Sequence, residues 1–185
     1  MFLDKIDVRS IVSHHFDTLY DYGTQRRSAS DFVVFFGLPI LAAVLALWRG
    51  VRIRIDAVNG LLTAFAIFVA ILPSVLLMVL TFLQTTQGDP ADRLVKERKR
   101  LLREITANLS YTILLSVALV ALAIITLTLL RKTEDPIGPV ETFFLVAGST
   151  NFVLTLLMVL KRMYALVLNE FDRHKLIGRP NKVAS

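Results

Sequence analysis

The sequence of 185 residues contains no cysteine. This absence excludes a disulfide framework, a thiol nucleophile and a thiolate metal site. The chain also lacks a glycine-rich phosphate loop, an HExxH pair and a GxSxG turn. Its apolar stretches hold no carboxylate pair, and proton- or cation-coupled carriers need ionisable groups at such positions. These absences argue against an enzyme and against a coupled carrier.

Apolar residues are abundant instead. They make up 55% of the chain, and its mean hydropathy is +0.61. These values are too high for a typical soluble domain and predict an integral membrane protein. The N-terminal stretch MFLDKIDVRS carries acidic side chains early and no basic segment followed by an apolar run. We therefore expect no cleavable signal peptide.

One long helix, from about residue 90 to about residue 130, is the element around which we expect the fold to be organised. Asp89 and Pro90 form a favourable helix start, because the carboxylate caps free N–H groups and proline fits the first turn. Residues 90–108 are charged and form a predicted cytoplasmic stem, whereas residues 109–130 are apolar. The apolar part is long enough to cross a bilayer core of about 30 Å.

Three further apolar stretches predict an all-α membrane protein with a four-transmembrane-helix bundle. The first span, at about residues 31–48, contains Pro39, and the second, at about residues 57–84, contains Pro73. We expect both spans to bend at the proline. The fourth span covers about residues 142–160. The membrane domain thus occupies residues 31–168, after a cytoplasmic amphipathic helix and linker in residues 1–30 and before a cytoplasmic tail in residues 169–185.

The distribution of basic residues predicts that both termini are cytoplasmic. Sixteen of the 21 lysines and arginines lie in the N-terminal segment, the stem and the C-terminal segment. Because basic residues stay on the cytoplasmic side, we expect an N-in/C-in, multi-pass protein of the bacterial inner membrane. Three arginines after the first span keep a three-span or re-entrant alternative open: Arg49, Arg52 and Arg54.

The stem is the first candidate binding surface, with Arg93, Lys96, Arg100, Leu101 and Arg103 as its candidate residues. One interpretation is a topology signal held by anionic membrane lipids. The other is a docking face for a cytoplasmic protein, a nucleotide or a nucleic acid, because the apolar side of the stem needs burial. Other copies of the chain, the N-terminal helix, the fourth helix or a foreign protein are the candidates to cover it. We expect no sequence-specific nucleic-acid binding.

Ser149, Thr150 and Asn151 form the second candidate site, inside the fourth span. An amide in lipid must find a partner, so Asn151 should face the other helices or an aqueous path. The three residues therefore serve either packing between helices or the lining of a pore. We identify no catalytic residue and no metal site, since His14 and His15 diverge on a helix. We expect no cofactor.

A resemblance rests on the runs ERKRLLREITANLSYTILLS (residues 97–116) and LLMVLKRMYALVLNEFD (residues 156–172), together with size and topology. The chain resembles the small four-span inner-membrane proteins of bacterial anti-phage defence operons, such as the membrane subunit of the Kiwa system. The resemblance implies an oligomeric membrane assembly with a cytoplasmic partner, and no catalytic residue follows from it. We therefore expect a non-enzymatic homo-oligomeric subunit that anchors or senses for a cytoplasmic partner in anti-phage defence. An ion-conducting or membrane-depolarising effector is the alternative.

Overall fold

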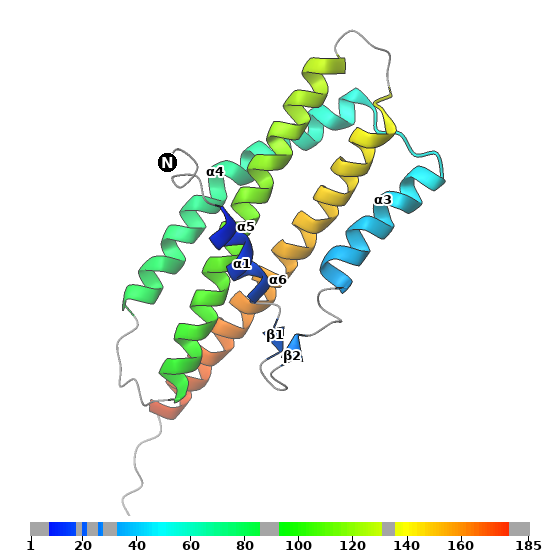
Figure 1. The fold of residues 1–185 in the computed structure, drawn as a ribbon. Helices are drawn as coiled ribbons and strands as arrows, with labels where there is room; N and C mark the ends of the chain where they lie inside the picture. Colours follow the sequence, from blue (N-terminus) through cyan, green and yellow to red (C-terminus); the bar gives the residue numbers. More distant parts are fainter. Residues whose placement is uncertain are drawn as a thin grey trace, which may run out of the picture.

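The computed structural model describes residues 8–17, 20–21, 26–27, 33–85, 93–130 and 136–177. In chain order its elements are the helix α1 (Arg9–Asp17), the strands β1 (Tyr20–Asp21) and β2 (Arg26–Arg27), the π-helix η2 (Val33–Gly37) and the helices α3 (Leu38–Trp48), α4 (Ile55–Thr85), α5 (Arg93–Leu130) and α6 (Pro139–Ile177). The described chain is therefore helical apart from one antiparallel pair of two-residue strands (Figure 1). The predicted helix start at Asp89 and Pro90, parts of the N-terminal segment and the end of the tail lie outside the described residues.

Three of the helices are long and apolar enough to cross a membrane. They cover Ile55–Gln84, Val95–Thr128 and Pro139–Leu168, with 30, 34 and 30 residues. Each exceeds the about 20 residues that a membrane span requires, so the chain has the character of a multi-pass membrane protein. The predicted first span corresponds to η2 and α3, whose apolar helix, Val33–Trp48, is shorter than these. A fourth span therefore does not follow from helix length.

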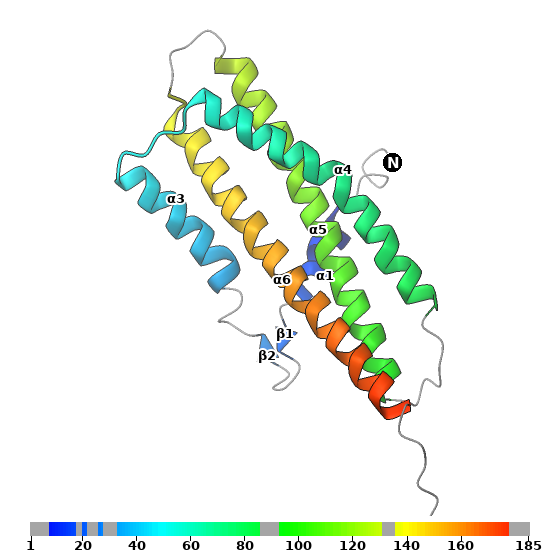
Figure 2. The same ribbon diagram turned by 180° about the vertical axis from the view of Figure 1, so that it is seen from behind.

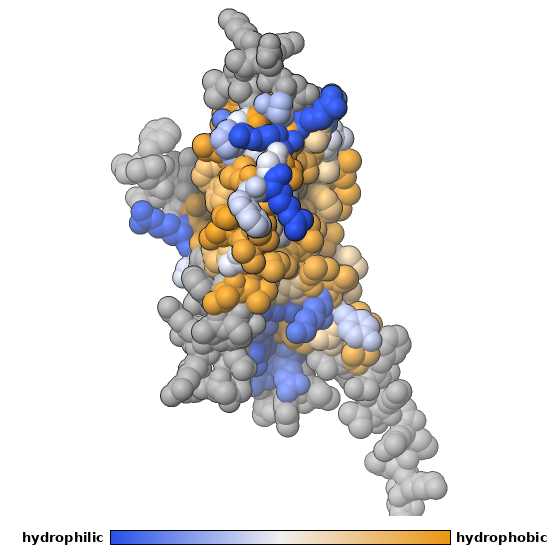
Figure 3. Space-filling model, turned by 90° about the vertical axis from the view of Figure 1, so that its right-hand side faces the viewer, coloured by the Kyte–Doolittle hydropathy of each residue, from blue (hydrophilic) through white to orange (hydrophobic). Residues whose placement is uncertain are grey.

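The helices form a row. α4 packs against α5, α5 against α6, and α6 against α3, while α1 lies against α5 at about half of its height (Figures 1 and 2). This arrangement leaves many large apolar side chains exposed, among them Leu41, Ile71 and Leu157. On the side of the molecule that Figure 3 presents, orange residues cover the middle and blue residues lie above and below them. Such a band is what contact with the hydrocarbon of a bilayer requires.

Buried side chains along the three long helices recur with the spacing of a coiled coil. On α5 they are three and four residues apart in turn: Leu102, Ile105, Leu109, Thr112, Ser116, Leu119, Ala123 and Thr126. On α4 and α6 they recur every seven residues: Val58, Phe65, Leu72 and Val79, then Leu145, Phe152 and Val159. A seven-residue repeat keeps one seam of each helix turned toward its neighbours, which explains how these helices stay in contact over their length.

The apolar side of the predicted stem is covered by the chain itself. Leu102 and Ile105 are both 0% exposed, and they belong to one cluster with Val79 of α4, beside Met163 and Leu166 of α6. The fourth helix, one of the predicted candidates, contributes Met163 and Leu166 of α6, and α4 contributes without having been predicted. The first half of α5 therefore packs between two other helices rather than standing free.

The two prolines have different positions in their helices. Pro39 lies in the first turn of α3, directly after η2, where a missing N–H is tolerated. The irregular backbone in the first predicted span is thus the π-helix η2, and not the predicted bend at Pro39. Pro73 lies inside α4, which continues without interruption, and Figure 2 shows the course of α4 turning between its two ends.

Backbone hydrogen bonds order the loop between α3 and α4 and join it to the segment before α6. Gly50 has a φ of 69°, and its N–H donates to the carbonyl of Leu47 while the N–H of Val51 donates to that of Ala46. This is a Schellman ending of α3, which requires the left-handed conformation that glycine adopts without strain. Beyond it, the N–H of Ile137 donates to the carbonyl of Ile53 at 3.0 Å. The segments that precede α4 and α6 are therefore fixed to each other.

Candidate functional site

A buried histidine on α1 is the centre of the candidate site. His15 is 2% exposed, and its Nδ1 lies 2.7 Å from Oδ1 of Asn108 on α5. Nδ2 of Asn108 donates to the carbonyl of Glu104 at 2.9 Å, which leaves the amide oxygen as the acceptor. The proton of the neutral ring therefore lies on Nδ1, which donates to Asn108.

Aromatic rings hold the imidazole on two sides. The ring of His15 is stacked on that of Tyr111, with centroids 3.9 Å apart and an angle of 3° between the planes. Phe35 of η2 meets the same ring edge-on, at 6.1 Å and 77°. Together with the hydrogen bond, these contacts attach α1 to α5 and to the segment before α3.

Burial lowers the pKa of His15 from 6.5 to about 4. The hydrogen bond with Asn108 acts in the opposite direction, and the charge of Arg162 lowers the pKa further. His15 is therefore neutral at pH 7. Its placement between α1 and α5 requires this uncharged form, because a charged imidazole would lose its hydration on burial.

A cluster of charges lies next to the histidine. One carboxylate oxygen of Glu104 lies 2.9 Å from Nε of Arg100, and the other lies 3.4 Å from Nε of Arg162 on α6. The side chains of Glu104 and Arg162 are each only 14% exposed. At this depth the Glu104 carboxylate has lost part of its hydration, and the two guanidinium groups compensate its charge.

Asn151 of α6 continues the contacts into the apolar part of the row. Its Oδ1 lies 3.5 Å from the hydroxyl of Tyr111, and its Nδ2 donates to the carbonyl of Phe35 at 3.4 Å. Pro39, four residues after Phe35, has no N–H to offer that carbonyl, so the amide replaces a helical donor. Thr155 donates to the carbonyl of Asn151 at 2.9 Å.

We call the resulting chain of contacts the polar network. It connects α1, α5 and α6 and consists of Arg100, Glu104, Arg162, Asn108, His15, Tyr111 and Asn151. Phe35 of η2 contacts it through the ring of His15 and the amide of Asn151. Within the part of the chain that the structure describes, no group of three or more His, Cys, Asp or Glu side chains has the arrangement of a metal site. Each member contacts at least one other member through an ion pair, a hydrogen bond or a ring stack.

The candidate residues of the stem do not come together at one place. Arg93 begins α5, and its side chain lies outside the described residues. Arg100 is half exposed and belongs to the polar network through Glu104, while Leu101 is partly buried. Lys96 and Arg103 are exposed, and because they are seven residues apart they share one face of α5.

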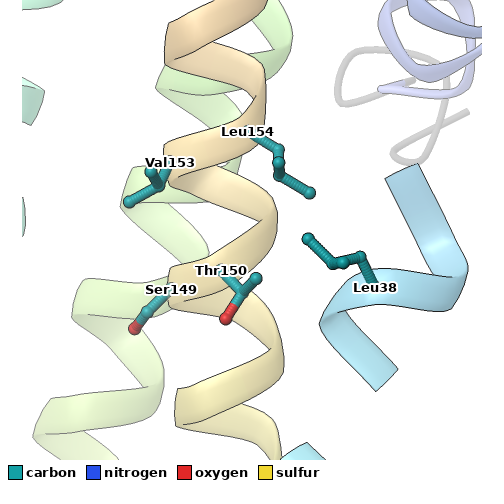
Figure 4. Close-up of a pocket in the computed structure, with 5 residues that line it drawn as sticks. All are labelled: Leu38, Ser149, Thr150, Val153 and Leu154. Carbon is teal, nitrogen blue, oxygen red and sulfur yellow. The ribbon is translucent and has the colours of Figure 1, made fainter. Parts of the chain in front are cut away.

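The candidate residues of the fourth span also separate. Ser149 and Thr150 line a cavity of about 360 Å³ with Leu38, Val153 and Leu154, and Figure 4 shows Leu38 of α3 and Leu154 of α6 pointing toward one another. Thr150 donates to the carbonyl of Val146 in its own helix at 2.8 Å. Asn151 faces the polar network instead. Thr112, Thr142 and Thr155 likewise donate to carbonyls of their own helices, as hydroxyls in membrane helices do.

Sequence reasoning missed His15, Asn108, Glu104 and Arg162 as members of a site. A signal for His15 was present, since it recurs at helical spacing with the apolar residues of the N-terminal segment. Asn108 and Glu104 were read as the end of a solvated stem, and Arg162 as part of a helix continuation. Their pairing joins residues up to 93 positions apart, which local periodicity does not reveal.

The chain shows no match to a protein-family model, to a curated protein or to a solved structure. The geometry of the site is therefore the basis of the functional interpretation.

Proposed function

We propose that the chain is a non-enzymatic, homo-oligomeric subunit of the bacterial inner membrane that anchors a cytoplasmic protein and senses its state. The polar network is the observation that supports this proposal. It connects the charged first half of α5 with α1 and with the middle of α6 by direct contacts. A protein bound at the charged half can therefore alter the position of α1 and of α6.

α1 is the element best suited to change position. It has nine residues, and a helix of this length is marginal in water on its own. Among the side chains of α1 that the structure describes, residues 9–15, only His15 is buried. Ile11 and Val12 are partly buried, so His15 is the most buried of the described side chains by which α1 is attached, and a partner that competes for α1 must displace it.

In this proposal η2 and α3 form the first of four spans, before α4, α5 and α6, and both termini are cytoplasmic. α1 lies beside α5 where its charged half meets its apolar half, the height expected of the cytoplasmic interface (Figure 1). A second copy of the chain or lipid covers the apolar faces that the row leaves exposed. The oligomer belongs to this proposal because an open row offers two such faces.

The face of α5 with Lys96 and Arg103 is the proposed docking surface, and its partner presents acidic groups. Reversal of Arg100 is unsuitable as a test, because it breaks the contact with Glu104. The informative variant is Lys96→Glu with Arg103→Glu. Its matched control, Arg49→Glu with Arg52→Glu, reverses two exposed charges in the loop between α3 and α4.

The experiment is affinity purification in mild detergent from the native host with neighbouring genes intact, followed by native mass analysis. We expect several copies of the chain with a stoichiometric soluble protein, which the Lys96/Arg103 variant loses and the control retains. A homo-oligomer without a soluble protein would contradict the proposal. Ion flux from loaded vesicles, compared with the Asn151→Leu variant, would then test the ion-conducting alternative. Protection of the host against phage, lost on deletion of the gene, tests the role in anti-phage defence.

A further inference from the structure

A groove between α4, α5 and α6 has the composition of a lipid site. Its volume is about 470 Å³, within the range of about 300–1,000 Å³ typical of small-molecule sites. All but one of its lining residues are apolar. Its accessible walls include Met78 and Phe82 of α4 and Met163, Leu166 and Val167 of α6, while Leu102 and Ile105 of α5, which also line it, are 0% exposed.

The exception is Arg98 of α5, which is partly buried. Met78 and Phe82, on the α4 wall of the groove, are 59% and 43% exposed, and Val167 on the α6 wall is 50% exposed. The protein surface around the groove is thus apolar at the place where the guanidinium of Arg98 forms part of the groove wall. Long basic side chains at such a boundary direct their charge to the level of lipid phosphates.

We propose that this groove binds one anionic phospholipid, with an acyl chain along the apolar walls and the phosphate on Arg98. The chemistry of the two parts matches the two parts of the ligand. A guanidinium donates paired N–H groups to phosphate oxygens. The apolar walls contact the acyl chain in place of neighbouring lipids. The cation in the wall favours an anionic ligand over an apolar helix of a second copy, because an apolar helix would remove hydration from the Arg98 guanidinium and supply no charge in its place. The proposal depends on the membrane-spanning character of α4, α5 and α6 and not on a cytoplasmic partner.

The test is native mass spectrometry of the full chain after exchange into nanodiscs of phosphatidylglycerol and phosphatidylcholine in equal amounts. We expect the wild-type chain to retain phosphatidylglycerol with a preference of about tenfold, equivalent to about 1.4 kcal/mol. Arg98→Gln should abolish the preference, and Arg103→Gln, an exposed cation of the same helix outside the groove, should keep it. Equal retention of the two lipids by the wild type, or an unchanged preference in Arg98→Gln, would overturn the proposal.

A second variant separates the lipid from a contact between copies. Met163→Trp adds volume to the α6 wall of the groove and should reduce lipid retention while the number of copies stays the same. A changed number of copies with unchanged lipid retention would assign the groove to a second copy and overturn the lipid site. Because these measurements need no soluble protein, their failure leaves the anchoring function untouched, and loss of the partner leaves the lipid site untouched.

Discussion

Substitution of His15 by alanine should release α1 from α5 while the three long helices stay folded. The change leaves Oδ1 of Asn108, a residue that is 0% exposed, without its donor at 2.7 Å. An unsatisfied buried acceptor costs about 1–3 kcal/mol, and loss of the stack on Tyr111 costs about 0.5–1.5 kcal/mol. Together these terms shift the attachment of α1 by about 2–4 kcal/mol, or by about 30- to 1,000-fold.

Hydrogen exchange of the α1 amides in nanodiscs measures this shift directly. The matched control is His14→Ala, because His14 is exposed and its Nδ1 contacts only the local carbonyl of Ser10, at 2.6 Å. The absence of native cysteine allows a second readout, in which a single cysteine at Ile11 reports access to a maleimide. If the α1 amides of His15→Ala stay as protected as those of His14→Ala, the conclusion that His15 attaches α1 to α5 is refuted.

The same attachment should weaken as the pH falls. The pKa of His15 is about 4 on the docked helix and 6.5 when it is free, so the released form binds the extra proton. The attachment is therefore fully present above pH 6.5 and declines as the pH falls from 6.5 toward 4. At pH 5 the loss is about 2 kcal/mol, or about 30-fold. His15→Asn, which does not titrate, should remove this dependence between pH 7 and pH 5, and an identical pH profile in both proteins would contradict the assignment.

The remaining predictions concern the middle of α6. Asn151→Leu should cost about 1–2 kcal/mol of stability, because the carbonyl of Phe35 loses its donor. In the Pro39→Ala background, where residue 39 regains its N–H, the cost should be smaller, and equal costs in a double-mutant cycle of thermal unfolding would count against the pairing. Gly148→Ala places a Cβ 2.5 Å from Cδ2 of Leu119 and should cost about 1–3 kcal/mol. Leu119→Ala should relieve that cost, and a cost unchanged in the double variant would show that the two helices are not in close contact there.

The long helices could be predicted because their signal is local. A run of apolar residues between charged or proline-containing segments indicates a helix of spanning length, and the predicted spans at 57–84, 109–130 and 142–160 lie within α4, α5 and α6. The same signal is weaker for Val33–Trp48, because this apolar helix is shorter than the other three. Its first part is a π-helix directly before the first turn with Pro39, and Phe35 in it accepts a hydrogen bond from Asn151, which lies 116 residues away in sequence.

The surroundings of the stem could not be predicted for a related reason. Leu102 and Ile105 give the stem an apolar side. That pattern predicts that the side is buried, but it does not predict which helix, lipid or protein buries it. The answer depends on how far α4 and α6 run alongside α5, which is a property of three helices at once. Asn151 was recognised because an amide stands out in an apolar span, whereas His15 lies in a mixed segment where no single residue does.

The bond between Ile53 and Ile137 has a mechanical consequence. This hydrogen bond ties the segments that precede α4 and α6, so the spacing of the two helices is fixed at this end of the row. The helices extend about 45 Å from this point, as 30 residues rise about 1.5 Å each. A rotation of about 5° of α4 relative to α6 about this point would displace the far end of α4 by about 4 Å. That far end is held by side chains packed on α5, since Val79 lies in one cluster with Leu102 and Ile105.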